Sequence, residues 1–329
     1  MSTVATSDTT TNPQYFGNVV QAVPLQAPAL ALLGSAGLSL PTPGSIANPG
    51  LRVSWDLEPE RGVTNQSGVV EISTVTVRNN VHTQEYNVIQ DFHEAISMSY
   101  ASQSATGEPA GNAADIAAIP NFAGITPSKF DKQIGGTLRA VAKAIDYQIF
   151  RGARAYTAGS DTARVMGGWF DRCGAAANYK DYATADLTLS TFIQHLADAY
   201  DVGALRGSGE YICFVSASTM VAVTKALAAY RVLPSGTEAN YVVDTFATPF
   251  GRIKMVLAPN TYSYSYVIVD MAEQRLIGNN MPGKGNFFVE KLAPTKVSED
   301  VWRLWGNLTL EFGHPLHIVA AKNVGGDSV

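Results

Sequence analysis

The sequence is poor in the residues that reveal chemistry most directly. Its two cysteines, Cys173 and Cys213, fit neither a zinc-ligand spacing nor a disulfide framework, so two reduced thiols in a cytoplasmic product are expected. Charged residues make up only 16% of the chain, below the roughly 25% typical of soluble domains. We therefore expect part of the surface to face other protein rather than water.

Basic residues are missing from the N-terminal region, where Arg52 is the first. No positive segment precedes the apolar stretch Ala27–Leu40, so no secretory signal is expected. That stretch contains proline and glycine and is too short to span a bilayer. Elsewhere Lys and Arg are scattered through a chain of net charge -5, which argues against sequence-specific reading of DNA. We expect no membrane contact.

Catalytic and metal-binding patterns are missing as well. His314 and His317 stand three apart in HPLH, but Pro315 lies between them and no third ligand is in view, which favours structural histidines. His93 and Glu94 would point to opposite faces of a strand, which disfavours a shared acid/base site.

The glycine runs do not form phosphate cradles. Gly167-Gly168 and Gly283-Lys284-Gly285 lack the required order of strand, glycine loop and helix. No GxSxG elbow occurs, and Cys173 has no histidine nearby in the sequence. Three acids are expected to cap or solvate turns: Asp171, Asp181 and Asp186. The sequence thus predicts no catalytic, cofactor-binding or metal-binding residue, no cofactor and no enzyme.

One long amphipathic helix is predicted from Thr126 to Gly152. Its apolar stripe recurs at steps of three and four: Phe130, Ile134, Leu138, Val141, Ile145 and Ile149. Polar residues lie off that stripe: Lys129, Asp131, Lys132, Arg139, Lys143 and Asp146. Gly135 and Gly136 weaken a helix by roughly 1 kcal/mol each, so we expect tertiary packing to hold it, with a bend or close packing at the pair.

Before this helix the pattern favours a long projecting β-hairpin. Leu51–Leu57 and Val69–Val77 are predicted strands around a turn-rich tip, Glu58–Gly68. From Tyr86 apolar and polar residues alternate, with one face formed by Tyr86, Val88, Phe92, Ile96, Met98 and Tyr100. The opposite face is Glu85, Asn87, Asp91, His93 and Ser97.

After the helix the pattern becomes α/β. Helices are predicted at Leu187–Tyr200, with Leu189, Phe192, Ile193, Leu196 and Tyr200 inward, and at Ala217–Tyr230. Predicted strands are Tyr211–Ser216, Val242–Phe246, Arg252–Ala258 and Tyr266–Asp270. The C-terminal region returns to β-structure, with Asn286–Leu292 paired to Val301–Phe312 and a last strand at His317–Ala321.

The order of these parts resembles the major capsid protein of tailed bacteriophages, the Hong Kong 97 fold. Four segments are similar to a subgroup of that family: NPGLRVSWDL (48–57), RNNVHTQEYNVIQDFHEAISMSYASQSATG (78–107), KFDKQIGGTLRAVAKAIDYQIFRGARA (129–155) and FFVEKLAPTKVSEDVWRLWGNLTLEFGHPLHIVAAKN (287–323). The Ala/Gly-rich stretch Ala105–Gly124 departs from the pattern as an insertion before the helix.

The resemblance implies an α+β fold with four parts. They are an N-terminal arm (1–50), an extended β-hairpin loop (51–100), a peripheral domain (101–183 and 285–329) with its spine helix at 126–152, and an axial α/β domain (184–284). The arm has apolar anchors, Leu25, Leu30, Leu32, Leu33 and Leu38, which under the resemblance would lie along a neighbouring subunit.

The implied function is structural. Copies of the chain would form pentamers and hexamers of an icosahedral shell around double-stranded DNA, bound without sequence specificity. Portal, decoration or scaffolding proteins would be further partners, and the protein would reside in the virion after assembly in the bacterial host cytoplasm. An encapsulin-like compartment shell is the alternative. A more distant one is an α/β hydrolase or a carbohydrate-binding protein that uses Tyr262, Tyr264 and Tyr266, which otherwise read as one face of a strand.

Overall fold

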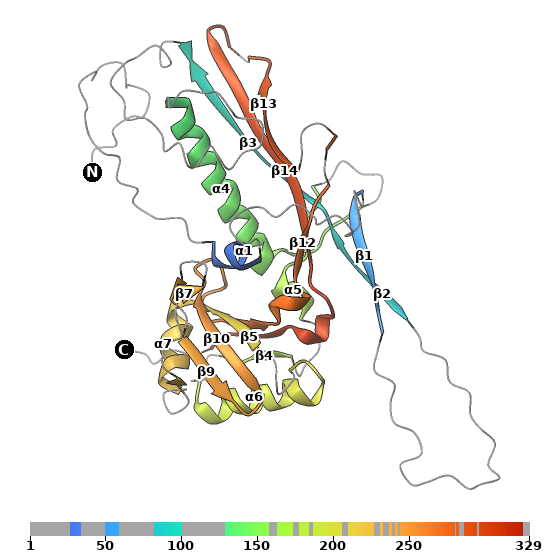
Figure 1. Ribbon diagram of the computed structural model, residues 1–329, viewed down its shortest axis with the longest axis vertical. Coiled ribbons are helices and arrows are strands. Elements are labelled where there is room, and N and C mark those ends of the chain that lie inside the picture. Colours follow the sequence, from blue (N-terminus) through green and yellow to red (C-terminus); the bar gives the residue numbers. More distant parts are fainter. Residues whose placement is uncertain are drawn as a thin grey trace, which may run out of the picture.

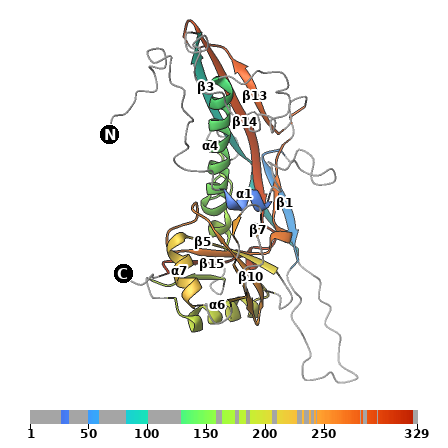
Figure 2. The same cartoon turned by 60° about the vertical axis from the view of Figure 1, so that its left-hand side comes forward.

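The computed structural model describes fifteen segments of the chain: residues 27–33, 50–58, 82–100, 129–157, 163–173, 178–183, 187–205, 210–226, 231–232, 237–238, 241–242, 244–279, 281–282, 286–294 and 296–324. A long sheet with helix α4 lies at one end and a smaller, more compact α/β unit at the other, as Figures 1 and 2 show. The predicted strand Val69–Val77, the insertion 105–124 and the run Gly283–Gly285 lie outside these segments.

Helix α4 runs from Lys129 to Arg151 and confirms the predicted helix over these residues. Ile134, Val141, Ile145 and Ile149 are buried, and Leu138 packs against the same core. At the glycine pair, Gly135 is buried, whereas Gly136 is exposed and has open space where a side chain would begin. Close packing occurs just after the helix, where the Gly168 amide donates to the Gly152 carbonyl oxygen at 2.7 Å.

The long sheet is antiparallel and contains β3 (Gln90–Ser99), β14 (Glu299–Glu311), β13 (Phe287–Leu292) and β12 (Arg275–Ile277). The predicted pairing of β13 with β14 is confirmed, from Phe287 opposite Gly306 to Leu292 opposite Val301. On the other side of β14, β3 pairs along its full length, from Gln90 opposite Leu308 to Ser99 opposite Glu299. Helix α4 lies along β3 and β14 on one face of this sheet (Figure 1).

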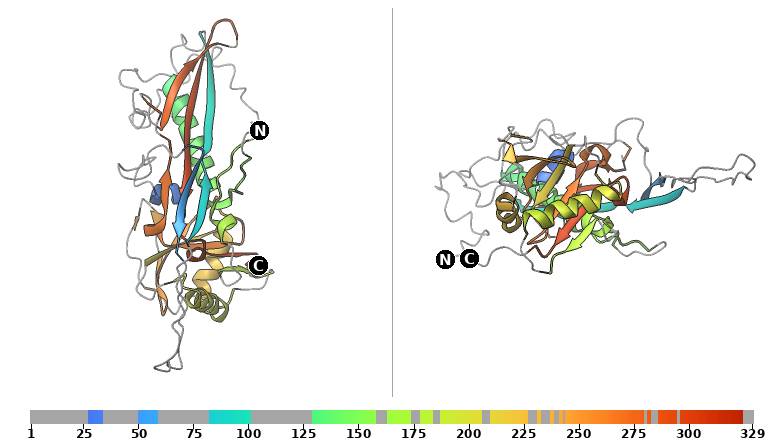
Figure 3. Two further views of the ribbon diagram at one scale, coloured as in Figure 1. Left: turned by 90° about the vertical axis from the view of Figure 1, so that its right-hand side faces the viewer. Right: turned by 90° about the horizontal axis from the view of Figure 1, so that it is seen from below.

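Strand β1 (Arg52–Leu57) pairs antiparallel with β2 (Thr83–Val88), and the two strands project sideways from the long sheet (Figures 1 and 3). Their base is anchored by a small apolar cluster of Val53, Ile89 and Ile277. Trp55 adds an edge-to-face contact with Phe312, 4.8 Å between ring centroids. Beyond that base Asp56, Thr83 and Gln84 are exposed, so the ends of both strands leave the core of the subunit.

The compact unit is built on a seven-stranded sheet of order β4-β15-β11-β5-β10-β9-β6. These strands are Tyr179–Asp181, Val319–Lys322, Tyr266–Val269, Glu210–Val215, Gly251–Leu257, Asp244–Thr248 and Arg231–Val232. A separate pair, β7 (Thr237–Glu238) and β8 (Tyr241–Val242), lies beside it. The sheet therefore combines strands from 210–269 with β4 and β15 from outside that range.

Side chains of the seven-stranded sheet alternate between two cores, as the two-residue period of a strand requires. Tyr211, Cys213 and Val215 face the first core, which contains residues of α6 (Leu189–Asp201) and α7 (Ala217–Ala226). Ile212 and Phe214 face the second core, which continues through α4 and α5 (Trp169–Arg172) into the long sheet. One continuous core thus joins the two sheets around the end of α4.

Several predicted details of the compact unit are wrong. Tyr200 is 46% exposed rather than inward, while His195 and Ala199 are buried on α6 instead. The last strand begins at Val319 and not at His317, because Pro315–His317 forms a short 3-10 helix, η3, which Pro315 initiates. A second 3-10 helix, η2 (Met271–Glu273), precedes β12.

The described part of the N-terminal region corrects a second expectation. Helix α1 (Pro28–Leu33) lies across α4, just above the compact unit (Figure 1). Leu30 is buried in the subunit's own core, and Leu32 and Leu33 pack against it. These three leucines therefore pack within their own subunit rather than against a neighbouring one. Leu25 and Leu38 lie outside the described residues.

A matched pair of glycine substitutions tests this packing. Gly136→Ala should raise the free energy of unfolding by about 1 kcal/mol, because the added methyl group meets nothing and alanine favours the helix. Gly152→Ala should lower it by about 2 kcal/mol, because its Cβ would lie 2.3 Å from the Met166 carbonyl oxygen. Urea unfolding of the unassembled subunit measures both. Equal effects of the two substitutions would contradict the described packing of α4.

Candidate functional site

Both histidines of the HPLH segment, His314 and His317, make contacts that hold local structure. The Leu316 amide donates to His314 Nδ1 at 3.1 Å, which caps η3, and His317 Nδ1 lies 2.6 Å from Glu273 Oε2. Burial, followed by the nearby His317, lowers the pKa of His314. Across the described segments, no three His, Cys, Asp or Glu side chains come together in a metal-binding group. The pair thus connects η3 to η2.

The other candidate residues are spread over the fold. His93 and Glu94 are exposed neighbours on β3, opposite Trp305 and Leu304 of β14. Both cysteines are buried and free. Burial raises the pKa of Cys173 to about 11 and that of Cys213 further, so both thiols stay protonated at neutral pH.

The predictions for the aspartates and for the tyrosines have different outcomes. Asp181 accepts from the Ala183 amide at 2.9 Å, as expected of a turn cap, and Asp171 accepts from the Arg154 amide at 3.1 Å. Asp186 lies outside the described residues. The expectation that Tyr262, Tyr264 and Tyr266 share a strand face is wrong. Tyr264 has a positive φ of 55° and is exposed, whereas Tyr266 begins β11 and is buried.

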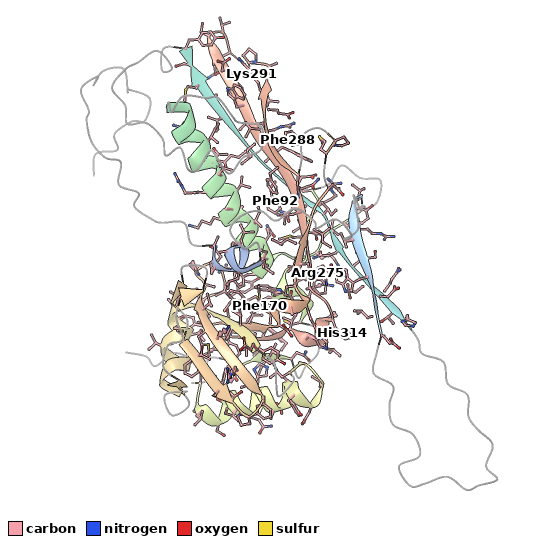
Figure 4. All side chains as sticks on the ribbon, in the orientation of Figure 1. Phe92, Phe170, Arg275, Phe288, Lys291 and His314 are labelled. Carbon is pink, nitrogen blue, oxygen red and sulfur yellow. The ribbon has the colours of Figure 1, made fainter. Side chains whose placement is uncertain are left out.

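A set of buried polar contacts lies where the two sheets meet, at the C-terminal half of α4. We call this region the joint and define it by Asn87, Asp146, Arg151, Trp169 and Asn260. These residues come from β2, α4, α5 and the turn after β10. In Figure 4, Phe170 of α5 marks the level of the joint, while Phe92 lies higher, beside α4, and Lys291 lies near the far end of the long sheet.

Asp146 is one of the polar residues that lie off the apolar stripe of α4. Its side chain is fully buried because α1 covers it. The Leu30 amide of α1 donates to Oδ1 at 3.0 Å, and Asn260 Nδ2 donates to Oδ2 at 2.8 Å. Burial raises the pKa of Asp146 to about 6, although these hydrogen bonds oppose the rise.

Asn87 was predicted on the strand face opposite Tyr86 and Val88, and the structure shows it fully buried. Its Nδ2 donates to the carbonyl oxygens of Gly167 at 2.9 Å and Leu310 at 2.7 Å. Its Oδ1 accepts from the amides of Gly167 at 2.7 Å and Val88 at 2.8 Å. All four hydrogen-bonding positions of one amide are thus used to connect β2, β14 and the segment before α5.

Arg151 and Trp169 complete the joint, and Gln274 links Trp169 to the chain after β14. Arg151 Nε donates to the Asn260 carbonyl oxygen at 2.9 Å, and its Nη2 donates to that of Thr261. Trp169 Nε1 donates to Gln274 Oε1 at 2.8 Å, and Gln274 Nε2 donates to the Phe312 carbonyl oxygen at 3.3 Å. The end of α4 is therefore connected to the turn after β10, and α5 is connected to the residues that follow η2 and β14.

Ion pairs attach the projecting strands to the same region. Glu85 of β2 lies 2.6 Å from Arg154 and 3.8 Å from Arg172, measured between its Oε1 and one guanidinium nitrogen of each. The Arg154 guanidinium also lies 4.0 Å from the Tyr86 ring centroid. Arg164 pairs with Asp91 of β3. These partly buried pairs fix the direction in which β1 and β2 leave the subunit.

Exposed apolar side chains and the margins of the long sheet are the features of the described surface that could meet another molecule. Large apolar side chains are exposed at both ends of the molecule, including Val297 at 97% and Val221 at 71%. Strands β3 and β13 form the two margins of the long sheet. Sheet margins and projecting strands are places where another chain can add a strand, so the arrangement favours contact with a further protein chain. None of the described helices is long and apolar enough to cross a membrane.

Sequence reasoning missed the joint because its residues are polar and far apart in the chain. Asn87 and Leu310 are separated by 223 positions, and Asp146 and Leu30 by 116. The available signal for Asp146 was the short apolar run Pro28–Leu33, which needs a covering partner. For Asn87, we find no local signal.

Comparison with known proteins gives a family match and a common fold. The family model described as "SU10 major capsid protein" matches residues 2–325. No curated protein sequence matches the chain.

Three solved structures cover nearly the whole chain. The capsid asymmetric unit of Cyanophage A-1(L) has a TM-score of 0.62 at 10% identity, covering 94% of this chain and 96% of that one. The capsid of a native GTA particle has a TM-score of 0.58 at 9% identity, covering 98% of this chain and 98% of that one. The holo-SrpI encapsulin complex from Synechococcus elongatus PCC 7942 has a TM-score of 0.52 at 8% identity, covering 92% of this chain and 97% of that one. At these identities the likeness concerns the fold alone.

Substitution of Asn87 tests the joint. Asn87→Ala leaves buried amide and carbonyl groups of Gly167, Val88 and Leu310 without this partner, and should lower the free energy of unfolding by at least about 3 kcal/mol. Gln84→Ala, on the same strand but exposed, is the control. Urea unfolding of the unassembled subunit compares the two. A difference within about 0.5 kcal/mol would contradict a stabilising role for Asn87.

Proposed function

The chain belongs to the SU10 major capsid protein family, and from this premise we propose that its copies assemble as pentamers and hexamers into the icosahedral shell that encloses the double-stranded DNA of a tailed bacteriophage. The α+β, Hong Kong 97-like fold predicted from the sequence is confirmed. The observation that carries the proposal is the family match over residues 2–325, almost the full chain.

We propose that the subunit has four parts. We assign residues 184–284 to an axial domain built on the seven-stranded sheet, to which β4 and β15 add strands from the flanking ranges. The peripheral domain, 101–183 and 285–329, includes α4 as its spine together with β13 and β14. Residues 51–100 provide the extended hairpin loop, and 1–50 the N-terminal arm, with α1 packed on its own subunit.

The exposed ends of β1 and β2 support an intersubunit role for the hairpin. The base of the pair has its own anchor in Val53, Ile89 and Trp55, so the strands leave the subunit in a defined direction. Past this anchor they lack a second layer within the described residues, and two-stranded hairpins in isolation are marginally stable in water. A surface on an adjacent copy would supply the missing layer.

We propose a structural role without catalysis, in the virion, after assembly in the bacterial host cytoplasm. DNA would be enclosed without sequence-specific contacts. A net charge of -5 suits this role, because a strongly basic wall would hold phosphates and retard packaging. Portal, decoration or scaffolding proteins are the further partners that we propose.

An encapsulin-like compartment is the second candidate, because an encapsulin shares the fold. The contents of recovered particles separate the two candidates. Double-stranded DNA in native particles supports the phage capsid, and a packaged protein cargo in their place would favour the compartment. Negative-stain images without any closed shells, from either the expressed protein or virions that carry it, would contradict both.

Deletion of Glu58–Gly68, between β1 and β2, tests the hairpin. The variant should remain folded, because the anchor of Val53, Ile89 and Trp55 lies outside the deletion, but its assembly should be strongly impaired. Circular dichroism monitors folding, and sedimentation with electron microscopy monitors assembly. A variant that forms shells as well as the parent would show that this segment is not needed between subunits.

A further inference from the structure

We propose that His314 is an acid-sensitive cap at the root of β1 and β2. As a neutral imidazole it holds η3 and the neighbouring carbonyl group that binds Trp55, and on protonation it releases both. Figure 4 places His314 beside the compact unit, on the side where β1 and β2 lie. The inference goes beyond shell formation and depends only on contacts within one subunit. A failure to form shells would therefore leave it intact, and a failure of the cap would leave the proposed assembly intact.

His314 accepts a hydrogen bond that only a neutral imidazole can accept. The first backbone N–H groups of a helix lack partners within the helix, and here the Leu316 amide of η3 donates to His314 Nδ1 at 3.1 Å. Because an amide N–H can only donate, Nδ1 carries no proton and the ring proton lies on Nε2. A protonated histidine has N–H groups at both ring nitrogens and offers no acceptor. The direction of the response follows from this contact, since acid removes the cap.

The cap is joined to the projecting strands through one peptide unit. Trp55 Nε1 of β1 donates to the Gly313 carbonyl oxygen at 2.8 Å, and this carbonyl shares its peptide unit with the His314 nitrogen. Because a peptide unit is planar, a change in the backbone at His314 re-aims that oxygen. The other end of η3 is held separately, because Asn178 Nδ2 donates to the Leu316 carbonyl oxygen. Loss of the cap therefore acts toward Trp55 and β1.

The charged groups that face His314 are engaged with other partners. Glu273 of η2 lies 2.6 Å from His317 Nδ1, and Glu85 of β2 pairs with arginines on the chain around α5. The His317 ring lies 5.3 Å from the His314 ring, so a proton on His317 disfavours one on His314. The other charged or titratable groups on the elements around this turn are Arg52, Asp56, Tyr86, Asp171, Tyr179, Lys180, Asp181, Asp270, Arg275 and Glu311.

The pH range of the response follows from proton linkage. Burial, followed by the nearby His317, lowers the pKa of His314 from its ordinary value of 6.5, while Glu273 and Glu85 oppose the shift. With the cap open, water reaches the ring and its pKa returns toward the ordinary value. The capped state therefore binds the proton less tightly. Its stabilising contribution is fully present above pH 6.5 and is lost as pH falls through the lowered pKa of His314.

Hydrogen exchange on the full-length, unassembled chain measures both the cap and its link to β1. Protection of the Leu316 amide, corrected for the intrinsic dependence of exchange on pH, should fall about fivefold from pH 8 to pH 5, as expected for the loss of one hydrogen bond. Protection of the Trp55 indole N–H should fall with it. Amides of β5, in the core of the compact unit, are the internal reference and should not share this response.

His314→Asn separates the charge from the cap, because an asparagine side chain can cap a helix without titrating. The variant should retain protection of the Leu316 amide at pH 8 and lose its dependence on pH. His93→Asn removes an exposed histidine of β3 instead. It is the matched control and should show the same dependence as the parent chain.

Two results in the parent chain would overturn the proposal, even if His314→Asn failed to fold. One is a proton on His314 Nδ1 at pH 8, which the chemical shifts of the ring nitrogens report. The other is equal protection of the Leu316 amide at both pH values. A response of Leu316 without one at Trp55 would overturn the link to β1. Persistence of the dependence in a folded His314→Asn variant would overturn the assignment to His314.

Discussion

The need to pair buried backbone groups where two sheets meet is the constraint on which this subunit depends. A strand pairs its amides and carbonyls with its neighbours, but among the described residues the long sheet and the seven-stranded sheet share no strand. Asn87 pairs backbone groups of Val88, Gly167 and Leu310 with both donors and both acceptors of its amide, and Asp146 accepts from the Leu30 amide of α1 and from the Asn260 side chain. Because unpaired buried polar groups are costly, the chain has one favourable arrangement at this point.

This fixed arrangement explains why an extended subunit can serve in a shell. The core continues from Leu308 of the long sheet through Ile149 of α4 to Phe214 of the compact unit, so the two ends are not independent. The ion pairs of Glu85 then set the direction of the projecting strands. A subunit with a defined shape presents the same surfaces in every copy, which closed symmetric assemblies require.

Local patterns predicted the elements well, and the contacts between them poorly. The period of 3.6 found α4, and alternation found β13 and β14, because each signal lies within one stretch of sequence. The pairing of β3 with β14 joins segments about 200 positions apart, which no local pattern reports. The burial of Asp146 was not predicted, because a helical stripe describes only one covered face, whereas α1 covers a second one. The family resemblance therefore predicted the fold and the structural role. The residues of the joint were not predicted.

Cryo-electron microscopy of assembled particles tests the central claim most directly, namely that the joint holds the subunit in a shape whose projecting strands need a neighbour. The account predicts that each copy retains the Asn87 and Asp146 contacts while β1 and β2 lie against an adjacent subunit. Particles in which β1 and β2 contact only their own subunit, or in which the two sheets separate at the joint, would contradict it.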